Sequence, residues 1–147
     1  MANIHINYMA ILIAVVANFV LGFIWYTPLF GKAWARELGL DTSQKPPASA
    51  LIKGMVIMII GNFFMAWVLA HNMAAWNPLS WGVTPDPRMT PMGMSFSAAI
   101  FTWLGFFLPV DLNSIAWENR SWKLFFINTG YHLAALIVVA LILGNMS

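Results

Sequence analysis

The chain has 147 residues, of which 61% are hydrophobic and 8% charged, and its mean hydropathy is +0.75. Ordinary soluble domains carry roughly 25% charged residues, so this composition excludes a water-soluble domain. The net charge of +2 is too small for a nucleic-acid surface, and the absence of cysteine excludes disulfides, thiol catalysis and thiolate metal sites. We therefore expect an integral membrane protein.

Four apolar blocks have the length needed to cross a hydrocarbon core of roughly 30 Å. They cover about residues 7–26, 51–73, 91–110 and 121–144. The first block lacks the basic residues and the cleavage site of a signal peptide, and the third has Thr90 as a plausible N-cap before Pro91. A bilayer cannot satisfy unpaired backbone groups, and the blocks are too long for barrel strands. The sequence thus predicts a single all-α domain, a polytopic four-helix bundle.

The basic residues are concentrated in two of the three loops. Only Arg88 belongs to the second loop, whereas the first and third loops and their edges carry Lys32, Arg36, Lys45, Lys53, Arg120 and Lys123. Because Lys and Arg near span ends are retained in the cytoplasm, the first and third loops should be cytoplasmic. This pattern predicts a multi-pass protein of the cell membrane with both termini on the non-cytoplasmic side.

Aromatic residues mark the expected membrane interfaces. Trp76 and Trp81 should lie at the outer interface, and an interfacial group on the cytoplasmic side should comprise Trp25, Tyr26, Trp34, Trp117 and Trp122. Tyr26 and Tyr131 are expected to be ordinary interface or packing aromatics. Residues 30–38 place apolar side chains at helical spacing around two basic ones, which predicts a short interfacial helix.

A weak internal repeat relates the first and third spans. Leu21-Gly22-Phe23 matches Leu104-Gly105-Phe106 without gaps, and in the same alignment Trp34 matches Trp117. The match indicates either a duplicated two-helix unit in parallel orientation or chance recurrence in an apolar chain. The second and fourth spans do not align.

Two segments carry a resemblance to a known family. The run Leu21-Gly22-Phe23-Ile24-Trp25-Tyr26-Thr27-Pro28-Leu29-Phe30-Gly31-Lys32-Ala33-Trp34, together with residues 125–132, resembles the family called domain of unknown function 1761. The resemblance covers nearly the whole chain and implies a small four-span, bacterial-type membrane protein. It implies no activity and no catalytic residues.

Polar residues inside the spans are the first candidates for function, because they are costly there and tend to face protein or water. They are Asn18, Asn62, Asn128 and His132. One hypothesis is a polar path or pocket near mid-membrane, with His132 as a titratable relay. The other is interhelical hydrogen bonding that holds the bundle together.

A second group of candidates is expected on the outer side. Thioether and imidazole groups suit Cu(I), and this region contains His5, His71, Met73, Met89, Met92 and Met94. Methionine is also an adaptable packing residue, and the chain is rich in it. We expect packing here, and no metal or cofactor.

The sequence contains none of the common enzyme motifs. The chain has no Gly-x-Ser-x-Gly elbow, His-Glu-x-x-His motif, phosphate loop or dinucleotide fingerprint, and Asp111 and Glu118 are expected in the third loop. Three functions therefore stay open.

The first candidate function is a non-catalytic protein that works through helix contacts, as a homo-oligomer or as an accessory subunit of a membrane complex. The others are a small oligomeric transporter or channel using the Asn/His path, and a membrane-embedded soft-metal site or enzyme. Expected partners are membrane lipids and other membrane proteins, not nucleic acid.

Overall fold

The structure is a computed structural model that describes residues 1–147, and it is all-helical. Four helical segments are long and apolar enough to cross a membrane: Tyr8–Leu29, Ala48–Trp76, Pro91–Ala116 and Trp122–Met146. This confirms the predicted fold class, a polytopic four-helix membrane protein. Each segment extends somewhat beyond its predicted bounds at one or both ends.

The first span consists of α1 (Tyr8–Ile24) and the π-helical turn η1 (Trp25–Leu29). The side-chain oxygen of Asn7 accepts a hydrogen bond from the Ala10 N–H and thereby caps α1. After η1 the chain bends at Phe30 into α2 (Gly31–Leu38), the short interfacial helix that the spacing predicts. Gly39, with φ +68°, ends α2 in the left-handed conformation that glycine adopts without strain.

The second span is the long helix α3 (Ala48–Trp76), which begins after Pro47. It is three residues longer at each end than predicted. A short 3₁₀ turn, η2 (Pro78–Trp81), follows, and the Asn77 side chain caps it by accepting from the Leu79 N–H.

The third span consists of α4 (Pro91–Thr102), the π-helical turn η3 (Trp103–Phe107) and α5 (Leu108–Ala116). Thr90 caps α4, as predicted. The predicted end at residue 110 is wrong, because Pro109 lies in the first turn of α5, where its missing N–H is tolerated. Asp111 is consequently a helical residue of the third span and not a loop residue.

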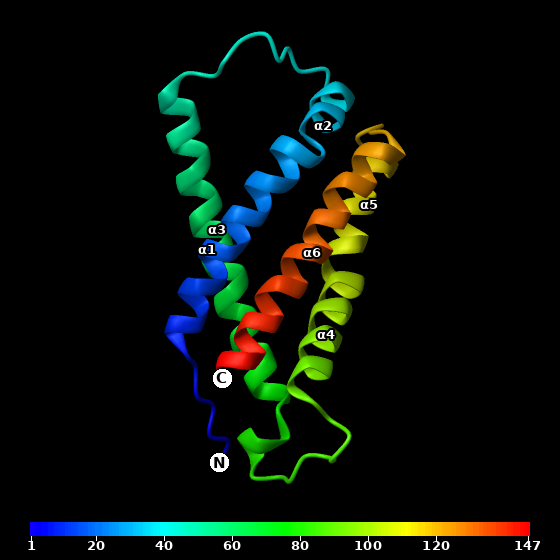
Figure 1. The fold of residues 1–147 in the computed structure, drawn as a ribbon. Coiled ribbons are helices and arrows are strands. Elements are labelled where there is room, and N and C mark those ends of the chain that lie inside the picture. Colours follow the sequence, from blue (N-terminus) through cyan, green and yellow to red (C-terminus); the bar gives the residue numbers. More distant parts are fainter.

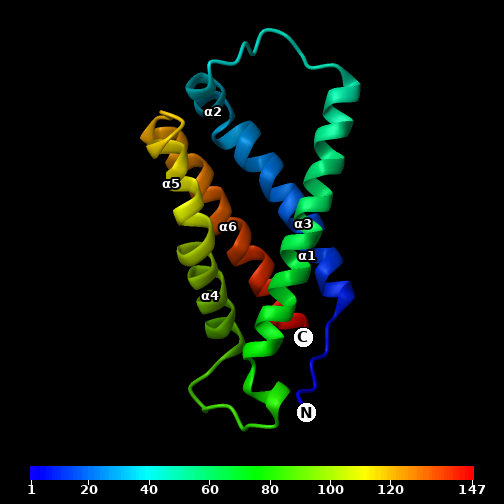
Figure 2. The ribbon, with the colours of Figure 1, turned by 180° about the vertical axis from the view of Figure 1, so that it is seen from behind.

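The fourth span, α6 (Trp122–Met146), is the central helix of the bundle. It packs against α1, α4, α5 and α3, and both ribbon views show it between the first and third spans (Figures 1 and 2). Small side chains dominate the buried contacts and let the helices approach closely. They are Ala10, Ala14, Ala66, Ala70, Ala99, Ala135 and Ala140.

The two halves of the chain have the same order of elements: a helix, a π-helical turn, a short helix and a long helix. The π-helical turns begin at Trp25 and Trp103, which are 78 positions apart. The order agrees with a duplicated two-helix unit in parallel orientation. Superposing the two π-helical turns pairs Trp25 with Trp103. The sequence match pairs Trp34 with Trp117, so the two alignments differ by five positions.

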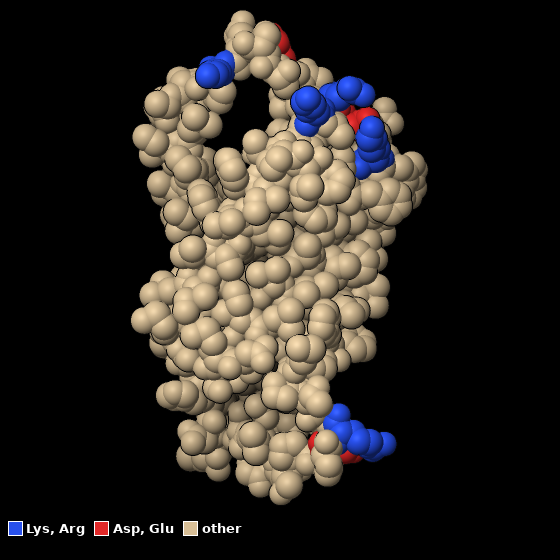
Figure 3. All heavy atoms as spheres, in the orientation of Figure 1, with Lys and Arg blue, Asp and Glu red and all other residues tan.

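The two ends of the bundle differ in charge. Lys and Arg side chains gather at the end formed by α2, α5 and the loops that follow them, which we call the basic end (Figure 3). The opposite end contains both chain termini and the segment between α3 and α4, and we call it the terminal end (Figure 1). Arg88 is the one Lys or Arg residue of the terminal end.

Candidate functional site

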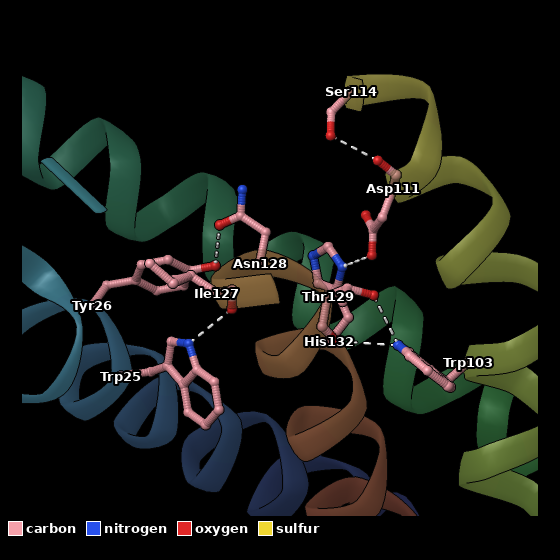
Figure 4. Close-up of polar contacts among 9 residues, drawn as sticks. All are labelled: Trp25, Tyr26, Trp103, Asp111, Ser114, Ile127, Asn128, Thr129 and His132. Atoms are coloured by element: carbon pink, nitrogen blue, oxygen red, sulfur yellow. Dashed lines mark hydrogen bonds and ion pairs between the residues drawn. The ribbon is translucent and has the colours of Figure 1, made fainter. Parts of the chain in front are cut away.

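Two tryptophans bond to the backbone of α6 in its half nearest the basic end (Figure 4). The Trp25 indole N–H donates to the carbonyl oxygen of Ile127 at 3.0 Å. The Trp103 indole N–H is shared between the carbonyl oxygen of Thr129 at 3.1 Å and its Oγ1 at 3.0 Å. The first and third spans thus hold α6 by equivalent contacts from their π-helical turns, a feature that often occurs at functional sites.

Proline accounts for the position of both π-helical turns. Proline lacks a backbone N–H and crowds the preceding turn, so the regular hydrogen-bond pattern cannot continue through it. Pro28 lies inside η1, and Pro109 lies two residues after η3. In η1 the Phe30 N–H donates to the Trp25 carbonyl oxygen at 2.8 Å. The two residues are five positions apart, whereas the partners in an α-helix are four apart.

The closest ionisable pair inside the spans joins α5 to α6. The Nδ1 atom of His132 lies 2.7 Å from Oδ2 of Asp111, and their side chains are 30% and 13% exposed. The Phe107 and Tyr131 rings lie beside the imidazole, with centroids 5.3 and 5.9 Å away. An ionised carboxylate only accepts hydrogen bonds, so it pairs with Nδ1 when that nitrogen carries a proton, and Nε2 has no protein partner.

A second polar contact joins η1 to α6. The Tyr26 hydroxyl donates to Oδ1 of Asn128 at 2.9 Å, and the Tyr26 ring meets the edge of Tyr131, with centroids 5.1 Å apart. Gly22 and Gly130 make room for these aromatics, because a Cβ atom would lie 3.0 Å from the Tyr131 hydroxyl or 3.3 Å from the Trp25 ring, respectively.

A third polar contact lies nearer the middle of the bundle. Nδ2 of Asn18 on α1 donates to Oδ1 of Asn62 on α3 at 2.6 Å. The remaining Asn18 oxygen and Asn62 nitrogen are buried without a hydrogen-bond partner. This bond between α1 and α3 is of the kind that the interhelical hydrogen-bonding hypothesis requires.

The four predicted intramembrane residues do not form one hydrogen-bonded path. Asn18 pairs with Asn62, Asn128 with Tyr26, and His132 with Asp111. Each bond joins two different helical segments of the same chain. The pairs are separate, and each contributes to holding two spans together.

Trp25 and Tyr26, which the sequence analysis assigns to the interfacial group, make contacts within the bundle. Both side chains point towards α6 and bond to it (Figure 4). Trp34 is partly covered and packs edge-on against Tyr26. Trp117 and Trp122 are 85% and 57% exposed.

Sequence reasoning missed Asp111, Trp103 and Thr129 as parts of this site. Pro109 predicts an end of the third span near residue 110, and this prediction puts Asp111 in a loop. The apolar spacing of Leu112, Ile115 and Ala116 was the available signal that the helix continues. Nothing in the sequence indicated the role of Trp103, because a tryptophan inside an apolar block can face either lipid or the interior of the bundle.

A large cavity lies at the terminal end, with a volume of about 1130 Å³. His5, Met73, Met89 and Met94 line it, so part of the predicted methionine and histidine cluster is brought together there. Met92 and His71 are outside the lining, and the His71 ring bonds to the Trp67 carbonyl oxygen. The six residues therefore do not assemble as one cluster.

Each end of the molecule has an exposed ion pair. Arg88 bonds to Asp86 at 2.7 Å at the terminal end, and Arg120 lies 3.9 Å from Glu118 at the basic end. The Arg88 hydrogen bonds hold the pKa of Asp86 below its usual value. At the basic end, the Ser121 hydroxyl donates to Glu37 and connects α2 to the start of α6.

These features define an all-helical, multi-pass membrane protein whose central helix is bonded to the other spans by isolated polar pairs. The chain belongs to the family described as "Protein of unknown function (DUF1761)", whose model matches residues 9–144. The family resemblance noted in the sequence is thereby confirmed. No curated protein and no solved structure matches the chain.

Proposed function

We propose that the protein is a non-catalytic membrane protein that works through helix contacts and associates with a second copy through α3. The observation that carries this proposal is the position of α3. Its residues 51–60 are all exposed, and this half diverges from α1 towards the basic end (Figures 1 and 2). The buried core residues of α3 are all in its other half, at Ala66, Leu69 and Ala70, and from the exposed half the Met58 side chain reaches α1 at Gly22.

The exposed half of α3 has a surface suited to another helix. Gly54 and Gly61 are two helical turns apart and so lie on the same side. A Cβ atom added at either position would meet no atom within 4 Å. Helices associate in membranes by close van der Waals packing, which small residues permit, and not by hydrophobic burial.

The internal polar residues support the same function. All four of the predicted intramembrane candidates bond within the chain, so they stabilise the bundle itself. Association with another molecule is then left to α3, whose remaining neighbours are membrane lipids. An accessory subunit would use the same surface for a different protein.

Energy transfer between donor-labelled and acceptor-labelled copies in liposomes tests this proposal. We expect concentration-dependent transfer for the natural sequence. Gly54→Leu with Gly61→Leu should weaken association by about tenfold, because leucine separates the two backbones. Gly105→Leu is the matched control, since Gly105 also has open space around it. Equal transfer in all three proteins would contradict a contact through α3.

The same proposal places the basic end in the cytoplasm and both termini on the non-cytoplasmic side. The supporting observation is the gathering of Lys and Arg at the basic end (Figure 3). Because the chain has no cysteine, single cysteines report orientation cleanly. A cysteine at Ser43 should resist an impermeant thiol reagent in intact cells, whereas one at Thr84 should react. The reverse pattern would overturn the orientation.

The His132–Asp111 pair favours a second candidate function, a small proton-linked carrier. Ionisable residues inside spans often mark ion pathways, and this pair keeps one imidazole nitrogen without a partner. Proton flux into dye-loaded liposomes tests it. A carrier would lose flux on His132→Gln while staying folded, whereas a packing protein would show no flux above that of empty liposomes.

A further inference from the structure

The cavity at the terminal end is open on one side. It is lined by the N-terminal segment, the end of α3, η2, the loop residues 88–90, the third span from Pro91 to Phe106 and the end of α6. Its volume of about 1130 Å³ is at the upper limit of ligand pockets, which measure roughly 300–1,000 Å³. Leu69, Ala70 and Leu143 belong to its apolar lining. The cavity is separate from the polar pairs around Trp25 and Trp103, which are at the other end of α6.

The cavity extends along α4 towards the middle of the membrane. Its lining includes Phe101 and Phe106, which are 72% and 74% exposed. From Pro91 to Phe106 the helix rises about 22 Å, whereas a lipid tail spans roughly 15 Å of one leaflet. Because α3 packs mainly on α1 and α4 mainly on α6, the space between α3 and α4 opens sideways to lipid.

Two polar residues on the spans line this space. Asn72 on α3 and Ser97 on α4 line the cavity, are exposed, and form no side-chain hydrogen bond with the protein. Polar groups at membrane depth are unfavourable unless they find a partner. They therefore indicate a ligand that accepts or donates hydrogen bonds next to an apolar segment.

The charged side chains of the lining further restrict the chemical class of the ligand. No Asp or Glu side chain lines the cavity, and Arg88 is its one Lys or Arg residue. Asp86 binds Arg88 through Nε and Nη2, which leaves Nη1 available for a further acceptor. A phosphate group fits this donor set, because guanidinium binds phosphate oxygens well.

We propose that this cavity binds one phospholipid with an anionic headgroup from the leaflet at the terminal end. Its phosphate lies at Arg88, its glycerol region lies near Asn72 and Ser97, and one acyl chain runs between α3 and α4 past Phe101. A wholly polar solute would leave the apolar walls in contact with water. A wholly apolar one would leave Asn72 and Ser97 without partners.

Native mass spectrometry of the full chain in detergent, with added phosphatidylglycerol or phosphatidylcholine, tests this site. We expect one phosphatidylglycerol per chain and weaker retention of phosphatidylcholine. Ala98→Trp fills the cavity and should reduce retention by about tenfold or more. Arg88→Gln should reduce it by about fivefold, the effect of one basic residue at a membrane surface. Arg88 is 90% exposed, so this variant leaves the fold intact.

Matched controls separate this site from the general lipid surface. Ile100→Trp enlarges an exposed residue of the same helix outside the cavity, and Arg120→Gln removes the arginine of the other ion pair. Both should retain phosphatidylglycerol. Equal loss in Ile100→Trp and Ala98→Trp would indicate ordinary surrounding lipid and overturn the proposal. Equal retention of the two lipids, unaffected by Arg88→Gln, would overturn the anionic headgroup. Displacement of the lipid by glycerol phosphate alone would indicate a soluble anion instead.

Discussion

The helices α6 and α3 are similar in sequence character but differ in position. Their most apolar stretches have mean hydropathies of 2.0 and 1.9, yet 39% of that stretch is buried in α6 and 6% in α3. α6 accepts side-chain hydrogen bonds from Trp25 and Tyr26 of the first span, from Trp103 of the third span and from Asn7. From the other spans α3 accepts one, from Asn18, and it accepts another from Trp81 in the turn that follows it. Hydropathy reports compatibility with lipid, and polar and small-residue contacts decide which helix becomes the core.

The same substitution in the two helices should give the largest difference. Leu136 on α6 is fully buried, and Leu51 on α3 is 51% exposed. Leu136→Ala leaves a cavity and should lower the free energy of unfolding by about 2 kcal/mol or more. Leu51→Ala removes only lipid contacts and should change it by less than about 0.5 kcal/mol.

Unfolding in mixed detergent micelles, followed by circular dichroism, measures this difference. Similar losses for the two alanine variants would show that α3 is as well packed as α6. In that case α3 would not be available for a second copy.

Removal of the acidic partner of His132 should have the next largest effect. Asp111→Leu leaves the Nδ1–H of His132 without an acceptor and should cost about 1 to 2 kcal/mol in the same unfolding assay. Combining it with His132→Phe should restore part of the loss, because no unpaired imidazole then remains. A double variant that loses the sum of the two single effects would show that the pair is not coupled.

The amide pair that attaches α3 to α1 should have the smallest effect. Asn18→Leu and Asn62→Leu each remove the same hydrogen bond, so each should cost about 0.6 to 1.7 kcal/mol. Their effects should be less than additive in a double-mutant cycle. A coupling energy near zero would show that the hydrogen bond between Asn18 and Asn62 does not contribute to stability.

The sequence alone was sufficient for the number and approximate position of the spans, though not for the end of the third, because span length and apolarity follow from the thickness of the bilayer. It also predicted α2 from its amphipathic spacing and the Thr90 cap from its side-chain chemistry. These are local properties. The contact of Asn18 with Asn62 was geometrically allowed from the depth of each residue but depended on how α1 and α3 turn towards each other.

The site around α6 could be predicted only in part, because it depends on two π-helical turns. The extra residue in η3 and the tolerated position of Pro109 carry the helix past residue 110 and bring Asp111 to His132. Trp25 carries an aromatic group that suits a membrane interface, and only its position in η1 turns it towards Ile127. Apolar periodicity indicates the spans but not these local changes in register.

Oxidative cross-linking of single cysteines in the membrane tests most directly whether α3 is the surface for self-association. Ile57 on α3 and Phe126 on α6 are 59% and 63% exposed, so a cysteine at either position is accessible. We predict a disulfide-linked dimer for Ile57→Cys and monomer for Phe126→Cys. Monomer in both, or dimer only for Phe126→Cys, would contradict association through α3.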